Sequence, residues 1–110
     1  MGPQIDVRQL QALAEGPEPP LLLDVREPWE AQLARIELPG VEQQLIPMGE
    51  IVSRVAELDP LQPVVVYCHH GMRSLQVVAF LQQRGFDSVY NLAGGIEAWS
   101  TGVDPAVPRY

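Results

Sequence analysis

Continuous apolar runs alternate along this chain with segments whose apolar residues recur at helical spacing. Runs of β-branched and aliphatic residues without polar alternation are typical of strands buried on both faces of a parallel sheet, and helices between them are typical of crossover connections. The pattern therefore predicts an α/β fold, with a mostly parallel sheet covered by helices on both faces. Strands are expected at residues 21–25, 44–46, 63–67 and 88–92. Helices are expected to start at or beside Asp6, Pro28, Pro47, Ser74 and Gly94.

The ends of the expected helices carry residues with a physical role there. Asp6 is suited to cap the first helix, and Pro28 is suited to the first turn of the second. Gly85 is suited to end the helix that starts at Ser74. Because their spacing places them near one face of that helix, four positions are expected to pack against the sheet. These are Leu75, Val78, Ala79 and Leu81 or Gln82.

The only cysteine, Cys68, directly follows the strand at 63–67 and directly precedes a helix. The backbone N–H groups of this turn and the positive end of the helix dipole are expected to stabilise an anion at the cysteine sulfur. The same field favours the thiolate, which is the nucleophilic form. Gly71 allows the positive φ or close backbone approach that a tight loop needs. Cys68 is therefore predicted to be a reactive thiol rather than a buried hydrophobe. The loop comprises Cys68, His69, His70, Gly71, Met72, Arg73 and Ser74.

The other side chains of this loop suggest binding roles. Arg73 carries a planar donor fork that suits an oxyanion substrate and suits bracing of the loop equally well. His69 and His70 are suited either to favour an anion beside the thiolate or to face the solvent, and Met72 is expected at the mouth of the site. Three adjacent residues seldom aim at one ion, and the chain has no further cysteine or histidine to complete a zinc site. We therefore expect neither a bound metal nor a cofactor.

Length and charge narrow the choice of function. A chain of 110 residues with 46% hydrophobic content fits one domain. Its basic residues are all arginines, and the formal net charge is −7, which makes nucleic acid an unsuitable partner. The absence of lysine excludes Schiff-base chemistry. Because the overall field repels anions, a small anionic substrate needs a local positive environment around Arg73.

The chain shows no apolar run long enough to span a membrane, and its first residues lack the basic and apolar regions of a signal peptide. A single cysteine forms no internal disulfide, which agrees with a reducing compartment. We therefore expect a cytoplasmic protein. Nothing in the sequence indicates an obligate interface, so we expect a monomer.

Three motifs in this order and spacing resemble the single-domain rhodanese family of sulfurtransferases: Leu23–Glu27, Cys68–Ser74 and Gly94–Trp99. The resemblance covers roughly residues 4–101, with an irregular tail at 102–110. It implies a central parallel sheet of five strands, and it gives Asp24 and Arg26 a supporting role at the neighbouring strand end. It also implies that Cys68 takes a sulfane sulfur from a donor such as thiosulfate, becomes a persulfide, and passes the sulfur to cyanide, a thiol or a sulfur-carrier protein.

The chain departs from the family at Glu37, where many members have a histidine. Its ending, residues 104–110, is similar to the tail of rhodanese domains fused to enzymes that activate ubiquitin-like sulfur carriers, which suggests a protein donor or acceptor. Two alternatives stay open. A cysteine-dependent phosphatase or arsenate reductase uses a similar loop, but with five residues between cysteine and arginine rather than the four between Cys68 and Arg73. A non-catalytic rhodanese-like module would bind or regulate other proteins.

Overall fold

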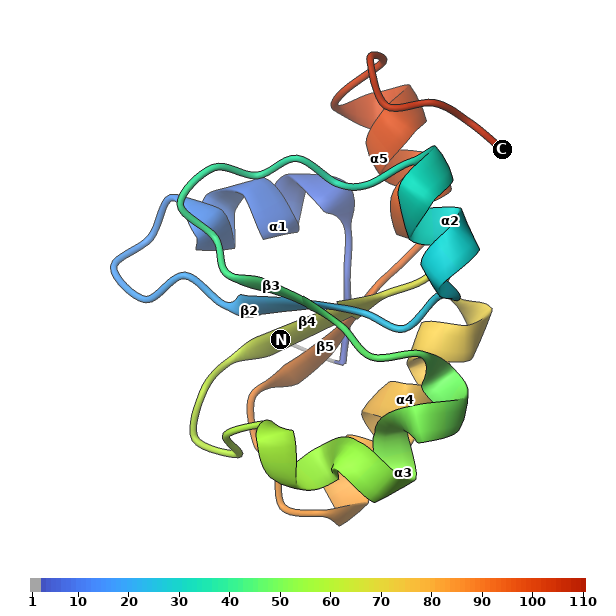
Figure 1. Ribbon diagram of the computed structural model, residues 1–110. Coiled ribbons are helices and arrows are strands. Elements are labelled where there is room, and N and C mark those ends of the chain that lie inside the picture. The colour runs from blue at the N-terminus through green and yellow to red at the C-terminus, as the bar shows by residue number, and fades with distance from the viewer. Residues whose placement is uncertain (1–2) are drawn as a thin grey trace.

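Five parallel strands form one sheet in the computed structural model, which describes residues 3–110 (Figure 1). The strands are β1 (Gln4–Ile5), β2 (Leu21–Asp24), β3 (Gln43–Leu45), β4 (Val64–Tyr67) and β5 (Val89–Leu92). Their order across the sheet is β1-β5-β4-β2-β3, and every neighbouring pair is parallel. The α/β fold and the five-stranded parallel sheet are thus confirmed. The apolar pattern alone did not predict β1, because two residues are too few to show a period.

The helices follow the expected order. They are α1 (Val7–Ala14), α2 (Pro28–Leu33), α3 (Ile51–Arg54), α4 (Met72–Gln83) and α5 (Gly95–Gly102). The 3₁₀ turns η1 (Met48–Glu50) and η2 (Val55–Glu57) flank α3, so the helix expected after Pro47 is a broken one. The tail expected from residue 102 follows α5, which still includes Gly102. No helix among residues 3–110 has the length and apolar character needed to cross a membrane.

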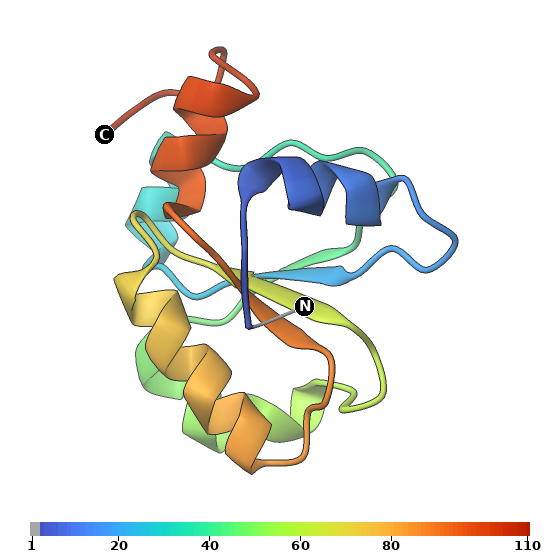
Figure 2. The same cartoon turned by 180° about the vertical axis from the view of Figure 1, so that it is seen from behind.

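Helices cover both faces of the sheet. Views from the front and the back place α1, α2 and α5 on one side, and α3 and α4 on the other (Figures 1 and 2). Neighbouring residues of β4 alternate between the two resulting cores, with Val64 and Val66 on the α4 side and Val65 on the α5 side. Because a strand buried on both faces has no solvated side, its sequence reads as a continuous apolar run.

The face that α4 turns to the sheet agrees with the expected one at Val78 and Leu81 and differs at the other positions. Its buried residues are Ser74, Val77, Val78 and Leu81, whereas Leu75 and Ala79 are exposed. The buried stripe has the ideal spacing of i, i+3, i+4 and i+7, but it contains a polar serine. The prediction selected the neighbouring stripe because Leu75 and Ala79 are more apolar than Ser74. The burial of that serine results from its place beside Cys68.

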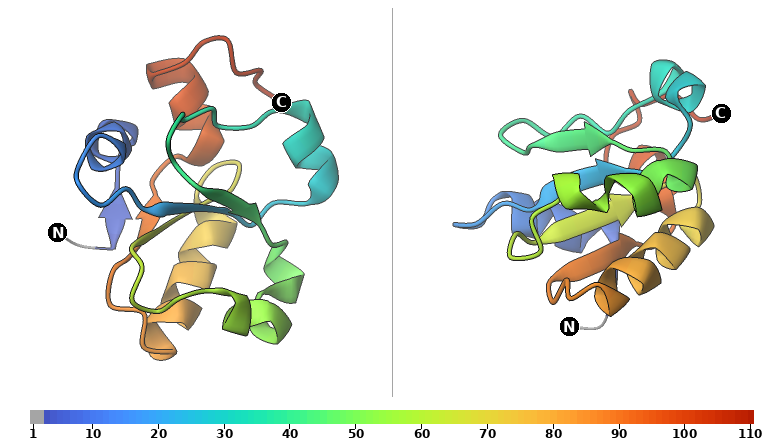
Figure 3. Two further views of the ribbon diagram at one scale, coloured as in Figure 1. Left: turned by 60° about the vertical axis from the view of Figure 1, so that its left-hand side comes forward. Right: turned by 60° about the horizontal axis from the view of Figure 1, so that its bottom comes forward.

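Parallel pairing brings the carboxyl ends of β2, β4 and β5 to one edge of the sheet. Asp24 lies opposite Tyr67, and Asn91 lies opposite Val66 one residue earlier. The segment after each strand therefore starts at the same edge. The C-terminal tail also returns to this region, beside α2 (Figure 3).

Candidate active site

The cysteine loop closes around the sulfur of Cys68. Cys68 is buried, with 1% of its surface exposed, and its Sγ accepts hydrogen bonds from the N–H groups of Gly71 (3.2 Å) and Ser74 (3.4 Å). Gly71 has a φ of 102°, which permits the turn before α4 and which L side chains rarely adopt. Both donors lie at the start of a helix of 12 residues, so the helix dipole adds to their field. This arrangement favours negative charge on the sulfur.

Asn91 of β5 fixes the direction of the hydrogen bonds on the far side of the sulfur. Its side-chain Nδ2 donates to Gln4 Oε1 (2.8 Å) and to the Gly71 carbonyl (3.2 Å), so its Oδ1 faces Ser74. The Ser74 hydroxyl has one hydrogen, and it uses this hydrogen to donate a hydrogen bond to that Oδ1. Since Ser74 Oγ lies 3.3 Å from Sγ and has no second proton, the neutral thiol donates to Ser74. Ser74 can donate to a thiolate only by leaving Asn91.

The start of α5 holds the carbonyl side of the cysteine loop. The Ile96 N–H donates to the Cys68 carbonyl (3.0 Å), and the Glu97 N–H donates to the His69 carbonyl (3.1 Å). A Cβ on Gly95 would meet these same two carbonyl groups. The glycine therefore allows the two segments to approach each other, which is the physical reason for a glycine in this motif.

Arg73 is held by a buried carboxylate on α2. Its two terminal nitrogens donate to Glu30 Oε1 (2.7 Å) and Oε2 (2.9 Å), and Glu30 is 3% exposed. The hydrogen bonds from Arg73 lower the pKa of Glu30 to about 2, against the opposing effect of burial, and the Glu27 N–H adds to the lowering. The same pairing raises the pKa of Arg73. In this conformation the guanidinium braces the loop against α2.

Asp24 and Arg26 form a second buried ion pair at the end of β2. Arg26 Nε and one terminal nitrogen donate to the two oxygens of Asp24 at 2.9 and 2.8 Å, and Arg26 is fully buried. The same terminal nitrogen also donates to the Ala34 carbonyl at 2.8 Å, so the pair anchors the segment after α2. Its hydrogen bonds reach the cysteine loop only indirectly, through Tyr110 and Glu30.

Tyr110 connects the two ion pairs. Its hydroxyl accepts a hydrogen bond from Arg26 (2.9 Å) and donates to Glu30 Oε2 (2.9 Å). Its ring stacks on His69, with centroids 3.9 Å apart and planes inclined by 11°. A residue far along the sequence thus contacts the loop next to Cys68.

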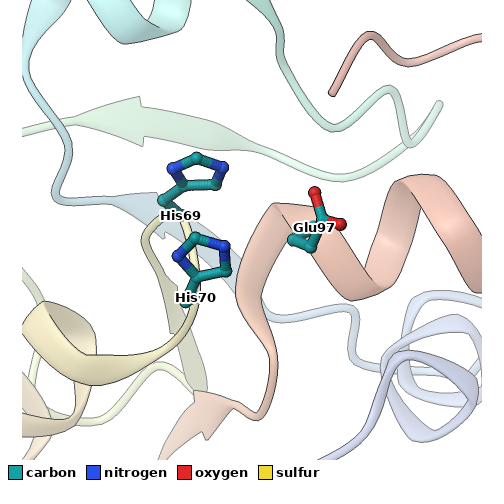
Figure 4. Close-up of side chains that lie close together, drawn as sticks. All are labelled: His69, His70 and Glu97. Atoms are coloured by element: carbon teal, nitrogen blue, oxygen red, sulfur yellow. The ribbon is translucent and has the colours of Figure 1, made fainter. Parts of the chain in front are cut away.

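His69, His70 and Glu97 lie together at the outer side of the loop (Figure 4). A nitrogen of each ring and a carboxylate oxygen lie within 4.8 Å of one another. The two rings are stacked, however, at 4.0 Å and 18°. Lone pairs of stacked rings lie in nearly parallel planes and do not converge on one ion, and Glu97 is already paired with Arg109. The cluster therefore does not fit a metal ion in this arrangement.

Met72 and Glu37 face the solvent. Met72 is 71% exposed at the start of α4. The exposed Glu37 lines a surface cavity of about 290 Å³ between the α2 region and the tail. Cys68 does not line this cavity. The cysteine and the N–H groups that contact its sulfur lie in the loop and not in this cavity.

The sequence analysis missed three residues of this network: Glu30, Asn91 and Tyr110. One of them carried a signal in the sequence: Asn91 is a polar side chain inside an apolar strand, and such a side chain needs a partner when it is buried. Glu30 carried none, because the sequence does not distinguish it from Glu27, which is exposed at the start of the same helix. Tyr110 carried no signal in the sequence, because its tail is irregular and its contacts are distant.

Comparison with known proteins agrees with this geometry. Residues 6–101 match the rhodanese-like domain family. A sulfurtransferase of Allochromatium vinosum is 39% identical over 97 residues, which are 88% of this chain and 87% of the relative. The thiosulfate sulfurtransferase GlpE of Vibrio cholerae is 37% identical over 86% of this chain and 85% of its own length.

Other relatives are longer. The chain spans 36% of the rhodanese-like/PpiC domain-containing protein 12, chloroplastic, of Arabidopsis thaliana (38% identical over 96% of this chain), and 24% of the adenylyltransferase and sulfurtransferase MOCS3-1 of Zea mays (34% identical over 97%). Among solved structures, a rhodanese-related protein from Thermoplasma volcanium superposes with a TM-score of 0.80 at 28% identity, covering 99% of this chain and 100% of that one. The family match, the relatives and the shared fold together establish that this chain belongs to the rhodanese-like domain family, whose members include sulfurtransferases.

Proposed function

We propose that this protein is a sulfurtransferase that carries a sulfane sulfur as a persulfide on Cys68. The observation that supports this most directly is the pair of N–H donors, from Gly71 and Ser74, that point at Sγ from the start of α4. Such donors stabilise a sulfur anion before the reaction and a terminal persulfide anion after it. The donor that we propose is thiosulfate or a persulfide.

The reaction has two transfers. The Cys68 thiolate attacks the outer sulfur of thiosulfate, a new S–S bond forms, and the S–S bond of the donor breaks with its electron pair leaving on sulfite. An acceptor nucleophile, which is cyanide, a thiol or a sulfur-carrier protein, then attacks the terminal sulfur and returns Cys68 as thiolate. No external oxidant or reductant is consumed.

In this proposal the loop residues have different roles. The N–H groups of Gly71 and Ser74 stabilise the anion, Arg73 braces the loop through Glu30, and exposed His70 and Met72 line the approach. Four residues between Cys68 and Arg73 give a smaller ring than the five of related phosphate-binding loops. The smaller ring suits one sulfur atom better than a tetrahedral anion.

Intact-mass measurement after incubation with thiosulfate tests the proposal. We expect a gain of one sulfur atom, its removal by cyanide, and no gain in Cys68→Ser, which has no thiol. Hydrolysis of aryl phosphate faster than sulfur transfer would favour the phosphatase. No sulfur gain with thiosulfate or with a persulfide donor would favour the non-catalytic binding module, a reading that the burial of Cys68 supports.

The partner and location follow from the same chemistry. Because a longer relative joins this domain to an adenylyltransferase, we propose a protein sulfur donor or acceptor besides the small anion. We also propose that the chain is a monomer. Neither nucleic acid nor a membrane is part of the proposal. A lone thiol that must stay reduced favours the cytoplasm. Repeating the mass measurement with candidate carrier proteins would identify the partner.

A further inference from the structure

We propose that Tyr110 is a positioning residue of the cysteine loop, and that it acts through its ring on His69 and through its hydroxyl on the Glu30–Arg73 ion pair. This inference rests on the proposed function, because it names a further residue that orders the same site. It concerns a side chain from the irregular tail, which lies beside α2 in two independent views (Figures 1 and 3).

The ring of Tyr110 completes a stack of three. His69 is nearly parallel to His70 at a centroid distance of 4.0 Å and nearly parallel to Tyr110 at 3.9 Å. Two rings this close to a third can be accommodated only on its opposite faces. His69, which directly follows Cys68, is therefore held between His70 and Tyr110, and its ring cannot rotate without displacing one of them.

The hydroxyl of Tyr110 acts at the other end of the loop. It donates to the Glu30 oxygen that also accepts from Arg73, at 2.9 Å in each case. Arg26 donates to the same hydroxyl at 2.9 Å. Burial raises the pKa of Tyr110 to about 12, so the hydroxyl keeps its proton and stays a donor to Glu30 at neutral pH. Tyr110 thereby orients the carboxylate that braces Arg73.

One side chain therefore restrains both sides of Cys68. It contacts residue 69 directly and reaches residue 73 through one carboxylate. The sulfur and its two N–H donors lie between these points. Because a small misplacement of donors around a reacting atom costs rate, loss of Tyr110 is expected to slow sulfur transfer without changing how much sulfur Cys68 finally holds.

His69 provides a readout of the stack that does not depend on activity. Burial and then the neighbouring His70 lower its pKa. The other charged groups around it are Glu30 from α2, Glu97 from α5 and Arg73 from α4. The chain has two histidines, so both titrations can be followed by NMR and assigned with His70→Gln. Removing the Tyr110 ring restores water to one face of His69, so its pKa is expected to rise.

Two substitutions separate the ring from the hydroxyl. In Tyr110→Phe, which loses the hydrogen bonds to Glu30 and from Arg26, we expect an unchanged His69 titration and a rate constant of persulfide formation about fivefold lower. In Tyr110→Ala we expect a raised His69 pKa and a further loss of about fivefold from the missing stack. The matched control is Tyr90→Phe, because Tyr90 packs against the core on the α5 side and its hydroxyl has no hydrogen-bond partner among residues 3–110. Its expected rate is that of the wild type.

The final number of sulfur atoms bound per chain distinguishes a positioning role of Tyr110 from a loss of folded protein. Each variant is expected to reach one sulfur atom per chain, only more slowly, whereas a partly unfolded variant would show a smaller end point at the original rate. An unchanged His69 titration and an unchanged rate in Tyr110→Ala would overturn the inference, as would a wild-type rate in Tyr110→Phe. If wild-type protein forms no persulfide, the proposed function fails, while the His69 titration still reports on the Tyr110 stack.

Discussion

At the scale of single residues, the proton on the Ser74 hydroxyl decides how Cys68 is solvated. In the neutral site, the Ser74 hydroxyl donates a hydrogen bond to Asn91 Oδ1, and the thiol donates one to Ser74 Oγ. When the thiolate forms, the sulfur loses its own proton and becomes an acceptor only. The two N–H groups of Gly71 and Ser74 then remain its fixed donors, and the Ser74 hydroxyl becomes a third by turning away from Asn91.

Ser74→Ala tests this arrangement. We expect persulfide formation to slow about tenfold, because the thiolate loses a donor while the Ser74 backbone N–H stays in place. We also expect a loss of about 1–3 kcal/mol in the free energy of unfolding, since Asn91 Oδ1 is left buried without a donor. Stopped-flow mixing with thiosulfate measures the rate of persulfide formation, and denaturant titration measures the free energy of unfolding. Ser53→Ala is the control, because Ser53 is exposed on α3; an equal effect there would contradict the role of Ser74.

At the scale of elements, the site is a junction of two helix starts. The start of α4 supplies N–H groups to the cysteine sulfur, and the start of α5 supplies N–H groups to the carbonyls of Cys68 and His69. The loop is thus held from both sides by backbone donors that need no side chain. Gly71 and Gly95 permit the close backbone approach that these contacts require.

Gly95→Ala should damage this junction more than an ordinary glycine substitution. Gly95 has a φ of 60°, and its Cβ would also strike the Cys68 and His69 carbonyls. Gly40 has a φ of 81° with nothing within 4 Å, so Gly40→Ala isolates the backbone strain. We expect a loss of about 1 kcal/mol for Gly40→Ala and about 3 kcal/mol for Gly95→Ala. Denaturant titration checks both; equal losses would mean that α5 moves away without cost.

At the scale of the whole molecule, buried charges join segments that are distant in sequence. Glu30 on α2 receives hydrogen bonds from Arg73 on α4 and from Tyr110 in the tail. This links the helices on the two faces of the sheet, at the edge where the strands end. The network stabilises the fold only while Glu30 is ionised.

Acid should therefore weaken the molecule in a definite pH range. The folded pKa of Glu30 is about 2 and its ordinary value is 4.5, so its contribution is complete above pH 4.5 and is lost as the pH falls towards 2. Glu30→Gln is expected to cost about 2 kcal/mol at pH 7, less than the full shift because Arg73 is partly solvated. Denaturant midpoints across this pH range measure it. The gap between wild type and Glu30→Gln should narrow with acid, and Glu18→Gln, an exposed control, should follow the wild type throughout.

Four of the five strands, the helices on both faces of the sheet and the position of the cysteine loop could be predicted from the amino-acid sequence. Strands such as Val64–Tyr67 are buried on both faces, so their apolar runs were visible without the fold. The loop from Cys68 to Ser74 is contiguous, and its sulfur is solvated by backbone groups within six residues, so local sequence was enough to predict it.

Three side chains that support the loop could be identified only in the folded chain. Glu30, Asn91 and Tyr110 come from α2, β5 and the tail, and they meet the loop because parallel strands end at one edge. The short strand β1 likewise forms only against β5. Ser74 was not recognised as a buried residue of α4 because its hydrogen-bond partner, Asn91, lies on β5. Long-range hydrogen bonds and ion pairs depend on distances that no local pattern contains, so the fold alone could supply them.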